Sequence, residues 1–168
     1  MSPRASALLL AVAVALVDRV SKIWIEKNVS MWDTIVVIPG LFQIVHTQNR
    51  GIVFGFLSDS DGLLRPVIVV AVAAVVLTLA FVYFWRLPQE LPAGQKYTRT
   101  ALALILGGAG GNLYDRLVKG GVTDFLDFHF GGYHWPAFNV ADSAITAGAC
   151  LLLLDFALAQ RREGSVRR

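Results

Sequence analysis

The sequence has few charged residues for its length and only one cysteine. Charged residues make up 16% of the chain, whereas 55% of the residues are hydrophobic, and the mean hydropathy is +0.59. This composition is too apolar for a soluble domain of this size and indicates a protein that lies in a lipid bilayer. The single cysteine, Cys150, excludes a disulfide framework and a thiolate metal cluster. Its place in an apolar run predicts a small buried packing residue.

Histidine is also rare. His46, His129 and His134 are scattered along the chain without the spacing of a recognisable metal site, and the sequence contains no HExxH pair. We therefore expect no metal and no other cofactor. The net charge of +3 could suggest nucleic-acid binding, but the arginines cluster beside apolar segments, which is typical of membrane topology signals. We expect no nucleic-acid partner.

Four apolar segments are predicted to be transmembrane helices within a single domain, residues 1–168. The clearest runs from Pro66 to Trp85, 20 residues without a charge. The third segment contains four glycines, which weaken a helix in water but let neighbouring helices approach closely in lipid. They are Gly107, Gly108, Gly110 and Gly111. The approximate bounds of the predicted spans are 5–25, 66–86, 98–116 and 140–160.

The N-terminal segment allows a second interpretation. Arg4 is followed by 13 uncharged residues, which is the size of the apolar region of a cleavable signal peptide. However, Val17 and Asp18 do not form a small-residue cleavage site, and the apolar pattern continues to Ile25 as one longer amphipathic helix. We therefore prefer a first helix that is retained.

Four spans place both termini on one side of the membrane. The N-terminus, the segment from Arg86 to Arg99 and the tail after Gln160 hold many of the basic residues, which indicates that this side is cytoplasmic. The segments of about 26–65 and 117–139 are then extracytoplasmic. Catalysis, if the protein is an enzyme, is expected to face outward.

A short β-hairpin is predicted between the first two spans. Thr34 to Ile38 and Leu41 to Thr47 are rich in β-branched and aromatic residues, and a Pro-Gly pair separates them. It could be only a packed surface loop, but an open hairpin edge can also accept an extended peptide. The expected fold class is an all-α membrane protein with four transmembrane helices, and with a small extracytoplasmic β-hairpin or cradle and loop between spans one and two.

Seven polar or charged residues lie at the extracytoplasmic ends of the predicted spans. Ionisable groups at this depth are costly, so they usually face the bundle interior, pair with one another and mark a functional pathway. Any one of them could instead be an interfacial anchor held by salt bridges. Seven on one face, with Asp124 and Asp127 nearby, favour a functional site. The seven are Asp18, Arg19, Lys22, Asn112, Asp115, Arg116 and Asp142.

Asp142 has a structural interpretation as well as a functional one. It follows Asn139, a favourable N-cap, by three residues, where a carboxylate suits the positive end of a helix. Both roles are compatible. Two carboxylates in one site cannot both ionise freely, so such a pair shares a proton. One carboxylate can then take a proton from water while the other donates to a carbonyl oxygen, which hydrolyses an amide without a covalent intermediate.

Other chemistries fit these residues less well. Ser21 next to Lys22 could suggest a serine–lysine pair, but adjacent positions on a helix point apart. Intramembrane carboxylates and glycine-interrupted helices also occur in ion-coupled transporters. A transporter should place its charges near the midplane and contain paired repeats, whereas here the charges crowd one face and no repeat is evident.

Four blocks of residues, in order along the chain, carry a family resemblance. The first is Asp18 with Lys22, and the second is NRGIVFG at 49–55. The third is GGAGGNLYDR at 107–116, which runs on to DFLD at 124–127, and the fourth is WPAFNVAD at 135–142. Together they resemble the bacterial lipoprotein signal peptidase family, also called signal peptidase II or prolipoprotein signal peptidase. The second block usually has a small residue at the position of Val53. This difference concerns only local packing or substrate fit.

The resemblance implies a membrane-embedded aspartic endopeptidase of the bacterial inner (cytoplasmic) membrane. It implies that Asp124 and Asp142 are catalytic. The substrate would be a prolipoprotein with a diacylglyceryl group on its cysteine, cut before that cysteine, and the other implied partners are membrane lipids and globomycin-type inhibitors. A non-catalytic lipoprotein scaffold would leave two convergent aspartates unexplained. The implied supporting or substrate-binding residues are Asp18, Lys22, Asn49, Gly51, Phe54, Asn112, Asp115, Arg116 and Asn139.

The two aspartates are expected to differ in mobility. Asp142 lies on a predicted helix, whereas Asp124 lies in the predicted loop after the third span. We therefore expect Asp142 to be the rigid partner and Asp124 to approach it with a mobile segment that contains glycine pairs at 120–121 and 131–132.

Overall fold

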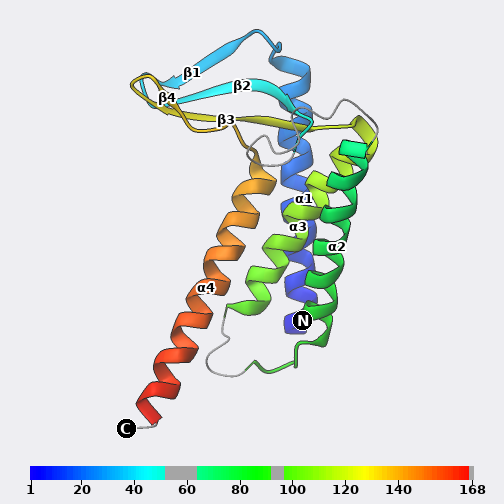
Figure 1. Cartoon of the computed structure of the whole chain (residues 1–168), viewed down its shortest axis with the longest axis vertical. Coiled ribbons are helices and arrows are strands. Elements are labelled where there is room, and N and C mark those ends of the chain that lie inside the picture. Colours follow the sequence, from blue (N-terminus) through cyan, green and yellow to red (C-terminus); the bar gives the residue numbers. More distant parts are fainter. Residues whose placement is uncertain (52–63, 92–96, 167–168) are drawn as a thin grey trace.

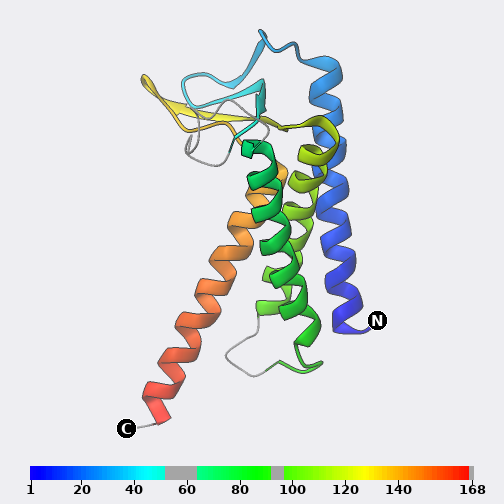
Figure 2. The same cartoon turned by 45° about the vertical axis from the view of Figure 1, so that its right-hand side comes forward.

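The computed structural model describes residues 1–51, 64–91 and 97–166, which form long helices and a small antiparallel sheet at one end of them (Figure 1). Both views place the sheet at one end, and the N-terminus and the last turns of the final helix toward the other (Figure 2). The helices are α1 (Pro3–Asn28), α2 (Leu64–Arg86), α3 (Thr98–Lys119) and α4 (Val140–Val166). The strands are β1 (Thr34–Ile38), β2 (Phe42–Asn49), β3 (Val122–Phe130) and β4 (Tyr133–His134).

Two helices in the described part of the chain are long and apolar enough to cross a membrane. They are the segments 66–86 of α2 and 140–160 of α4, with mean hydropathies of 2.9 and 1.6. Along α2, Val72, Val75 and Leu79 are more than half exposed, which is expected of a helix face that contacts lipid rather than water. Helices α1 and α3 are less apolar because they carry buried ionic groups near the sheet.

Cys150 corrects one expectation from the sequence. It is exposed on α4, so the prediction that it is buried is wrong. Helix α4 packs mainly against α3, and its far side, which includes Leu153 and Phe156, is exposed. In a membrane helix an apolar residue can face lipid as easily as protein, so apolarity alone does not predict burial.

Helix α3 is the centre of the bundle, because it packs against α1, α2 and α4. A Cβ atom at Gly107 would lie 2.5 Å from the carbonyl oxygen of Ala11 on α1, and one at Gly108 would lie still closer to that of Ala141 on α4. A Cβ at Gly110 would meet nothing within 4 Å. Close helix packing therefore requires glycine at Gly107 and Gly108, as expected, but not at Gly110.

Polar side chains cap the helix ends away from the sheet. Arg4 donates from Nη2 to the carbonyl oxygen of Leu87, 2.8 Å away, just after α2. Asp155 on α4 accepts from the backbone N–H of Tyr97 at 2.7 Å and from the hydroxyl of Thr98 at 2.9 Å, where α3 begins. These contacts satisfy backbone groups that a helix terminus leaves unpaired. Arg4, expected as a topology signal, therefore also has a structural role.

The sheet is larger than the sequence interpretation predicts. The predicted hairpin forms as β1 and β2, but the segment expected to be a loop before α4 contains β3 and β4, in the sheet order β1-β2-β3-β4. The prediction that Asp124 lies in a loop is therefore wrong. The missed signals were the alternation in VTDFLDFHF and the Gly-Gly turn after it, in which Gly131 has a φ of 58°.

The register of the strands brings distant segments together. Thr47 on β2 lies opposite Asp124 on β3, after a β-bulge that follows Ile44. The chain just before α4 lies beside the same strand. The backbone N–H of Leu126 donates to the carbonyl oxygen of Phe138 at 2.8 Å, and the carbonyl oxygen of Leu126 accepts from the backbone N–H of Phe138 at 3.0 Å. The start of α4 is thereby held next to Asp124.

Candidate active site

The described residues that the family resemblance selects meet at the sheet end of the bundle. They come from α1, α3, α4, β3 and the end of β2, and the contacts below join most of them in one network. Phe54 lies outside the described residues. Gly51 donates its backbone N–H to Asn49 Oδ1 at 3.0 Å and so orients the Asn49 side chain.

Asn139 links the two aspartates. Its Nδ2 donates to Asp124 Oδ1 at 2.6 Å, and its backbone N–H donates to Asp142 Oδ2 at 3.2 Å. The backbone N–H of Asp142 donates in return to Asn139 Oδ1 at 3.0 Å, which completes a reciprocal cap at the start of α4. The predicted N-cap is confirmed. The same fully buried residue holds both carboxylates in place.

Asn112 connects this pair to the charged groups of α1. Its Nδ2 donates to Asp142 Oδ1 at 2.8 Å, and its Oδ1 accepts from Lys22 Nζ at 2.9 Å and from Asn139 Nδ2 at 3.3 Å. With partners at both ends of the amide, the orientation of the side chain is determined. Asn112 therefore fixes the position of Asp142 from α3.

Lys22 is fully buried, and its ammonium group joins three acceptors. It contacts Asp18 Oδ2 at 2.8 Å and Asp115 Oδ2 at 2.9 Å, in addition to Asn112. Asp18 also accepts from the backbone N–H of Ala141 at 2.9 Å, which ties α1 to the first turn of α4. These ionic residues thus fasten three helices to one another, and Asn112 connects them to the aspartate pair.

The serine–lysine alternative receives no support from this arrangement. Ser21 donates its hydroxyl to the backbone oxygen of Asp18 at 2.8 Å, and the donors of Lys22 are occupied by two carboxylates and an amide. Lys22 is therefore not placed to take a proton from Ser21.

Asp124 is only 3% exposed. It accepts from Asn49 Nδ2 at 3.1 Å as well as from Asn139. Burial raises the pKa of Asp124 from its usual 3.8 to about 6, and the negative charge of Asp142 acts in the same direction, while the two amide donors and Lys22 oppose them. A carboxyl group with a pKa of about 6 can both hold and release a proton near neutral pH.

Arg116 places a positive charge beside the pair. Its half-buried guanidinium donates from Nη1 to the backbone oxygen of Asn112 at 3.2 Å, and its charge interacts with Asp142 and Asp124. The side chain is suitably placed to contact a substrate backbone or to stabilise negative charge at the carboxylates.

The sequence interpretation missed a second polar cluster, on β3 and β4. Asp127 accepts from Gln43 Nε2 at 2.6 Å and lies 3.1 Å from His134 Nδ1. His129 lies directly opposite His134 in the strand pairing, so these two histidines are not scattered in space as expected. The Gly-Gly turn between them was the signal that could have predicted their pairing.

A family model described as "Signal peptidase (SPase) II" matches residues 10–158. The chain belongs to the signal peptidase II family. The lipoprotein signal peptidase of Solibacter usitatus is 45% identical and is matched over 93% of both chains. That of Pseudomonas aeruginosa is 44% identical over 87% of this chain and 84% of the relative. A solved structure described as a bacterial membrane enzyme matches with a TM-score of 0.76 and 29% identity, covering 98% of this chain and 92% of the other.

Membership of the signal peptidase II family makes the chain a peptidase and confirms the predicted family. Together with its apolar helices, the likeness to a membrane enzyme supports a location in a membrane. Three of the four sequence blocks converge here, and so does the described beginning of the remaining one, at Asn49 to Gly51. Each contributes at least one side chain or backbone group to the network around Asn112, Asn139 and Lys22.

Proposed function

We propose that this signal peptidase is an aspartic endopeptidase that cleaves diacylglyceryl-modified prolipoproteins just before the lipidated cysteine. The curated relatives bear the name lipoprotein signal peptidase. The observation that carries the aspartic mechanism is the bridging of Asp124 and Asp142 by the single residue Asn139. Two carboxylates held in one buried site can share a proton and act as acid and base in amide hydrolysis.

In the proposed mechanism Asp124 carries the shared proton at rest. Its raised pKa of about 6, caused first by burial, supports this role. Asp142 takes a proton from the attacking water while Asp124 gives its proton to the oxygen of the scissile carbonyl, which forms a neutral tetrahedral diol. Transfer of a proton from Asp142 to the amide nitrogen then breaks the C–N bond, and Asp124 recovers its proton from the diol.

The surrounding residues are proposed to position this pair and the substrate. Asn112 and Asn139 orient the two carboxylates, and Asn49 holds Asp124 from β2. Lys22 on α1 holds this helix against α3, which carries Asn112 and Asp115. Arg116 would contact the backbone of the bound peptide, since its guanidinium lies beside the pair.

An apolar hollow next to the site supports a lipid-bearing substrate. Its volume is about 510 Å³, and Phe125 in its lining directly follows Asp124 in the chain. Acyl chains are recognised by burial of apolar surface, so this hollow is suited to part of the diacylglyceryl group. The lining residues are Leu16, Val17, Val20, Ser21, Trp24, Ile25, Ile44 and Phe125. Globomycin-type peptide inhibitors would occupy the same site.

The proposed topology has all four helices crossing the bacterial inner membrane, with the sheet end outside and both termini in the cytoplasm. Arg4, Arg86 and Arg99 at the end away from the sheet support this orientation. A substrate that is held in the bilayer by its signal helix and acyl chains would then present its scissile bond at the outer surface, where the aspartates lie.

Movement of Asp124 toward Asp142 remains part of the proposal, although Asp124 lies on a strand rather than in a loop. Gly120 and Gly131, with φ values of 72° and 58°, lie on either side of β3 and are suitable hinge positions. Faster amide hydrogen exchange in β3 than in the first turn of α4 is expected without substrate. Equally slow exchange in both segments would contradict this movement.

The deciding experiment is cleavage of a synthetic diacylglyceryl-modified prolipoprotein by the purified full chain in detergent. Asp124→Asn and Asp142→Asn should each lower the cleavage rate by roughly 10²–10⁴-fold, because each removes a proton-transfer group. Asp33→Asn, at an exposed acid between α1 and β1, is the matched control and should cleave normally. The same peptide without lipid should be cut poorly. Normal cleavage by either Asp124→Asn or Asp142→Asn would exclude the aspartic mechanism.

A further inference from the structure

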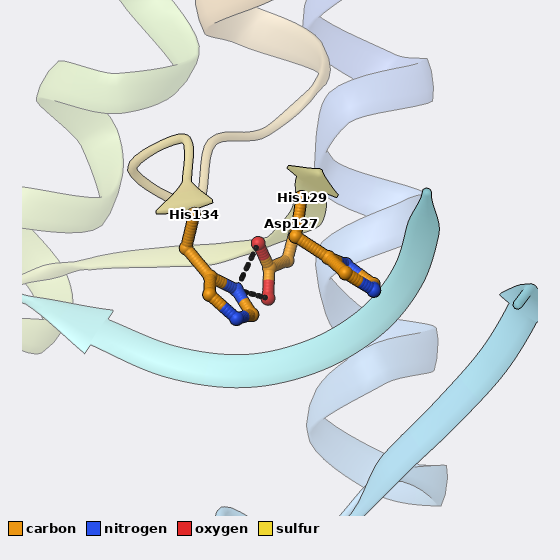
Figure 3. A group of neighbouring side chains, drawn as sticks. All are labelled: Asp127, His129 and His134. Atoms are coloured by element: carbon orange, nitrogen blue, oxygen red, sulfur yellow. Dashed lines mark hydrogen bonds and ion pairs between the residues drawn. The ribbon is translucent and has the colours of Figure 1, made fainter. Parts of the chain in front are cut away.

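We propose that Asp127, His129 and His134 form a binding site for a divalent transition metal ion, with Zn²⁺ as the representative ion (Figure 3). The site is distinct from the Asp124–Asp142 pair and shares no residue with it. It goes beyond the proposed peptidase function and does not depend on it.

The backbone places these three side chains on one face of the sheet. Residues two apart on a strand project to the same side, so Asp127 and His129 share a face of β3. His134 on β4 lies directly opposite His129 and therefore joins them. Phe128, between the two ligand positions of β3, projects to the other side, where it stacks on Phe42 with ring centroids 4.7 Å apart.

The side chains are already close together. One potential ligand atom from each of the three residues lies within 4.8 Å of the others, and the two imidazole rings have centroids 4.9 Å apart. Figure 3 shows the carboxylate of Asp127 between the two rings. Tetrahedral Zn²⁺ with bonds of about 2.0–2.1 Å needs ligand atoms about 3.3 Å apart. His134 Nδ1 and Asp127 Oδ2, 3.1 Å apart, already have about this spacing. Rotation of the histidine side chains would bring the third ligand atom toward it, and water would complete the coordination.

The chemistry of the three groups suits a borderline metal ion. Two imidazoles and one carboxylate are ligands that Zn²⁺, Ni²⁺ and Cu²⁺ accept, whereas Mg²⁺ and Ca²⁺ prefer oxygen ligands alone. Asp127 is only 7% exposed, and Gln43 on β2 holds its carboxylate through a 2.6 Å hydrogen bond. An outer partner of this kind commonly orients a metal ligand.

His129 provides an independent observation. Within the described part of the chain its Nδ1 is buried and makes no hydrogen bond. A buried polar atom without a partner is uncommon and calls for a physical reason. The contact between Asp127 and His134 could be a simple ion pair, but such a pair gives the Nδ1 atom of His129 no hydrogen-bond partner. Coordination of a metal ion would engage the His129 ring as well.

Zn²⁺ titration of the full chain, purified without a histidine tag and stripped with EDTA, tests the proposal. Isothermal titration calorimetry should detect one saturable site, and Zn²⁺ should raise the thermal midpoint of the protein by mass action. His129→Gln and His134→Gln should each weaken Zn²⁺ binding by at least tenfold, and Gln43→Ala should weaken it by roughly 10–100-fold as the loss of an outer partner. An excess of Mg²⁺ should not compete.

The remaining histidine supplies the matched control. His46 contacts the backbone oxygen of Val29 at 2.7 Å, and His46→Gln should leave Zn²⁺ binding unchanged. Binding should also persist in Asp142→Asn, which separates this site from the aspartate pair. Absence of a saturable site, binding that survives both His129→Gln and His134→Gln, or binding that His46→Gln removes would each overturn the proposal. If His129→Gln does not fold, His134→Gln decides, because that side chain is half exposed.

Discussion

Two pairs of acids lie at the sheet end of the bundle, and they are held in different ways. Asp18 and Asp115 are bridged by the ammonium group of Lys22. Asp124 and Asp142 are bridged by the neutral amide and backbone of Asn139. The bridge of the first pair carries a positive charge, whereas the bridge of the second is a neutral amide that only donates hydrogen bonds. The second pair can therefore relieve its repulsion by binding a proton.

Within one network, the two pairs of acids are expected to serve different purposes, one stability and the other chemistry. The lysine-bridged pair fastens α1, α3 and α4, and its loss is expected to act mainly on folding. The amide-bridged pair is expected to act mainly on the rate of cleavage. Asn112 contacts Lys22 on one side and Asp142 on the other, so it connects the two pairs.

The largest expected contrast is between Asp142→Asn and Asp18→Asn. Asp142→Asn should lower the cleavage rate by roughly 10²–10⁴-fold with little change in thermal midpoint, since the shape of the side chain is kept. Asp18→Asn should lower the thermal midpoint but retain measurable cleavage at temperatures where the protein is folded. Rate and midpoint are measured on the same detergent sample. If Asp18→Asn lowered the cleavage rate as much as Asp142→Asn does, and left the thermal midpoint unchanged, the two pairs would not differ in role.

Lys22→Met should destabilise the protein by about 3–5 kcal/mol, because it leaves the buried carboxylate of Asp18 without its cation and removes one of the cations around the buried Asp115. The free energy of unfolding in mixed detergent–denaturant micelles measures this effect. Adding Asp18→Asn to Lys22→Met should recover part of the loss, since Asp18 is the buried carboxylate that Lys22→Met leaves without a cation. A Lys22→Met variant as stable as the unaltered chain would show that the ionic bridge does not fasten the helices.

The position of the amide-bridged pair depends on close packing of α3 against α4. Gly108→Ala should destabilise the protein by about 1–3 kcal/mol, because its Cβ would meet the carbonyl oxygen of Ala141, next to Asp142. Gly110→Ala is the matched control, with open space around its Cβ, and should be neutral or slightly stabilising. The thermal midpoints of the two variants provide the test. Equal midpoints would show that this contact relaxes without cost.

The smallest expected effect is a shift of a pH profile. In the proposed mechanism Asp124 must be protonated, so kcat/KM should fall as pH rises through about 6, the value to which burial raises the pKa of Asp124. The hydrogen bond from Asn49 lowers that pKa, so Asn49→Ala should move the fall in kcat/KM to higher pH. Thr47→Val is the control, because Thr47 donates to the backbone oxygen of Asp124 and not to its carboxylate. A shift to lower pH would contradict the assignment of the proton.

The helices and the first hairpin could be predicted because their signals are local. Apolar runs define α2 and α4, and the Pro-Gly pair at 39–40 separates β1 from β2. The strands β3 and β4 are not predicted although their alternation and Gly-Gly turn are also local, since the segment after the third span is interpreted as a loop. Asp127 is instead bound by Gln43 and His134, and Asp124 by Asn49 at the end of β2.

The sequence by itself determined the cap that Asn139 and Asp142 form, because three residues span less than one helical turn and the two groups meet whatever the rest of the fold does. It also determined that α2 and α4 are apolar enough to cross a membrane. Only the tertiary structure decided that Asn139 reaches Asp124 and that Lys22 reaches Asn112, 90 residues away in the chain. Such contacts depend on strand register and on the approach of glycine-containing helices, and no local pattern specifies either of them.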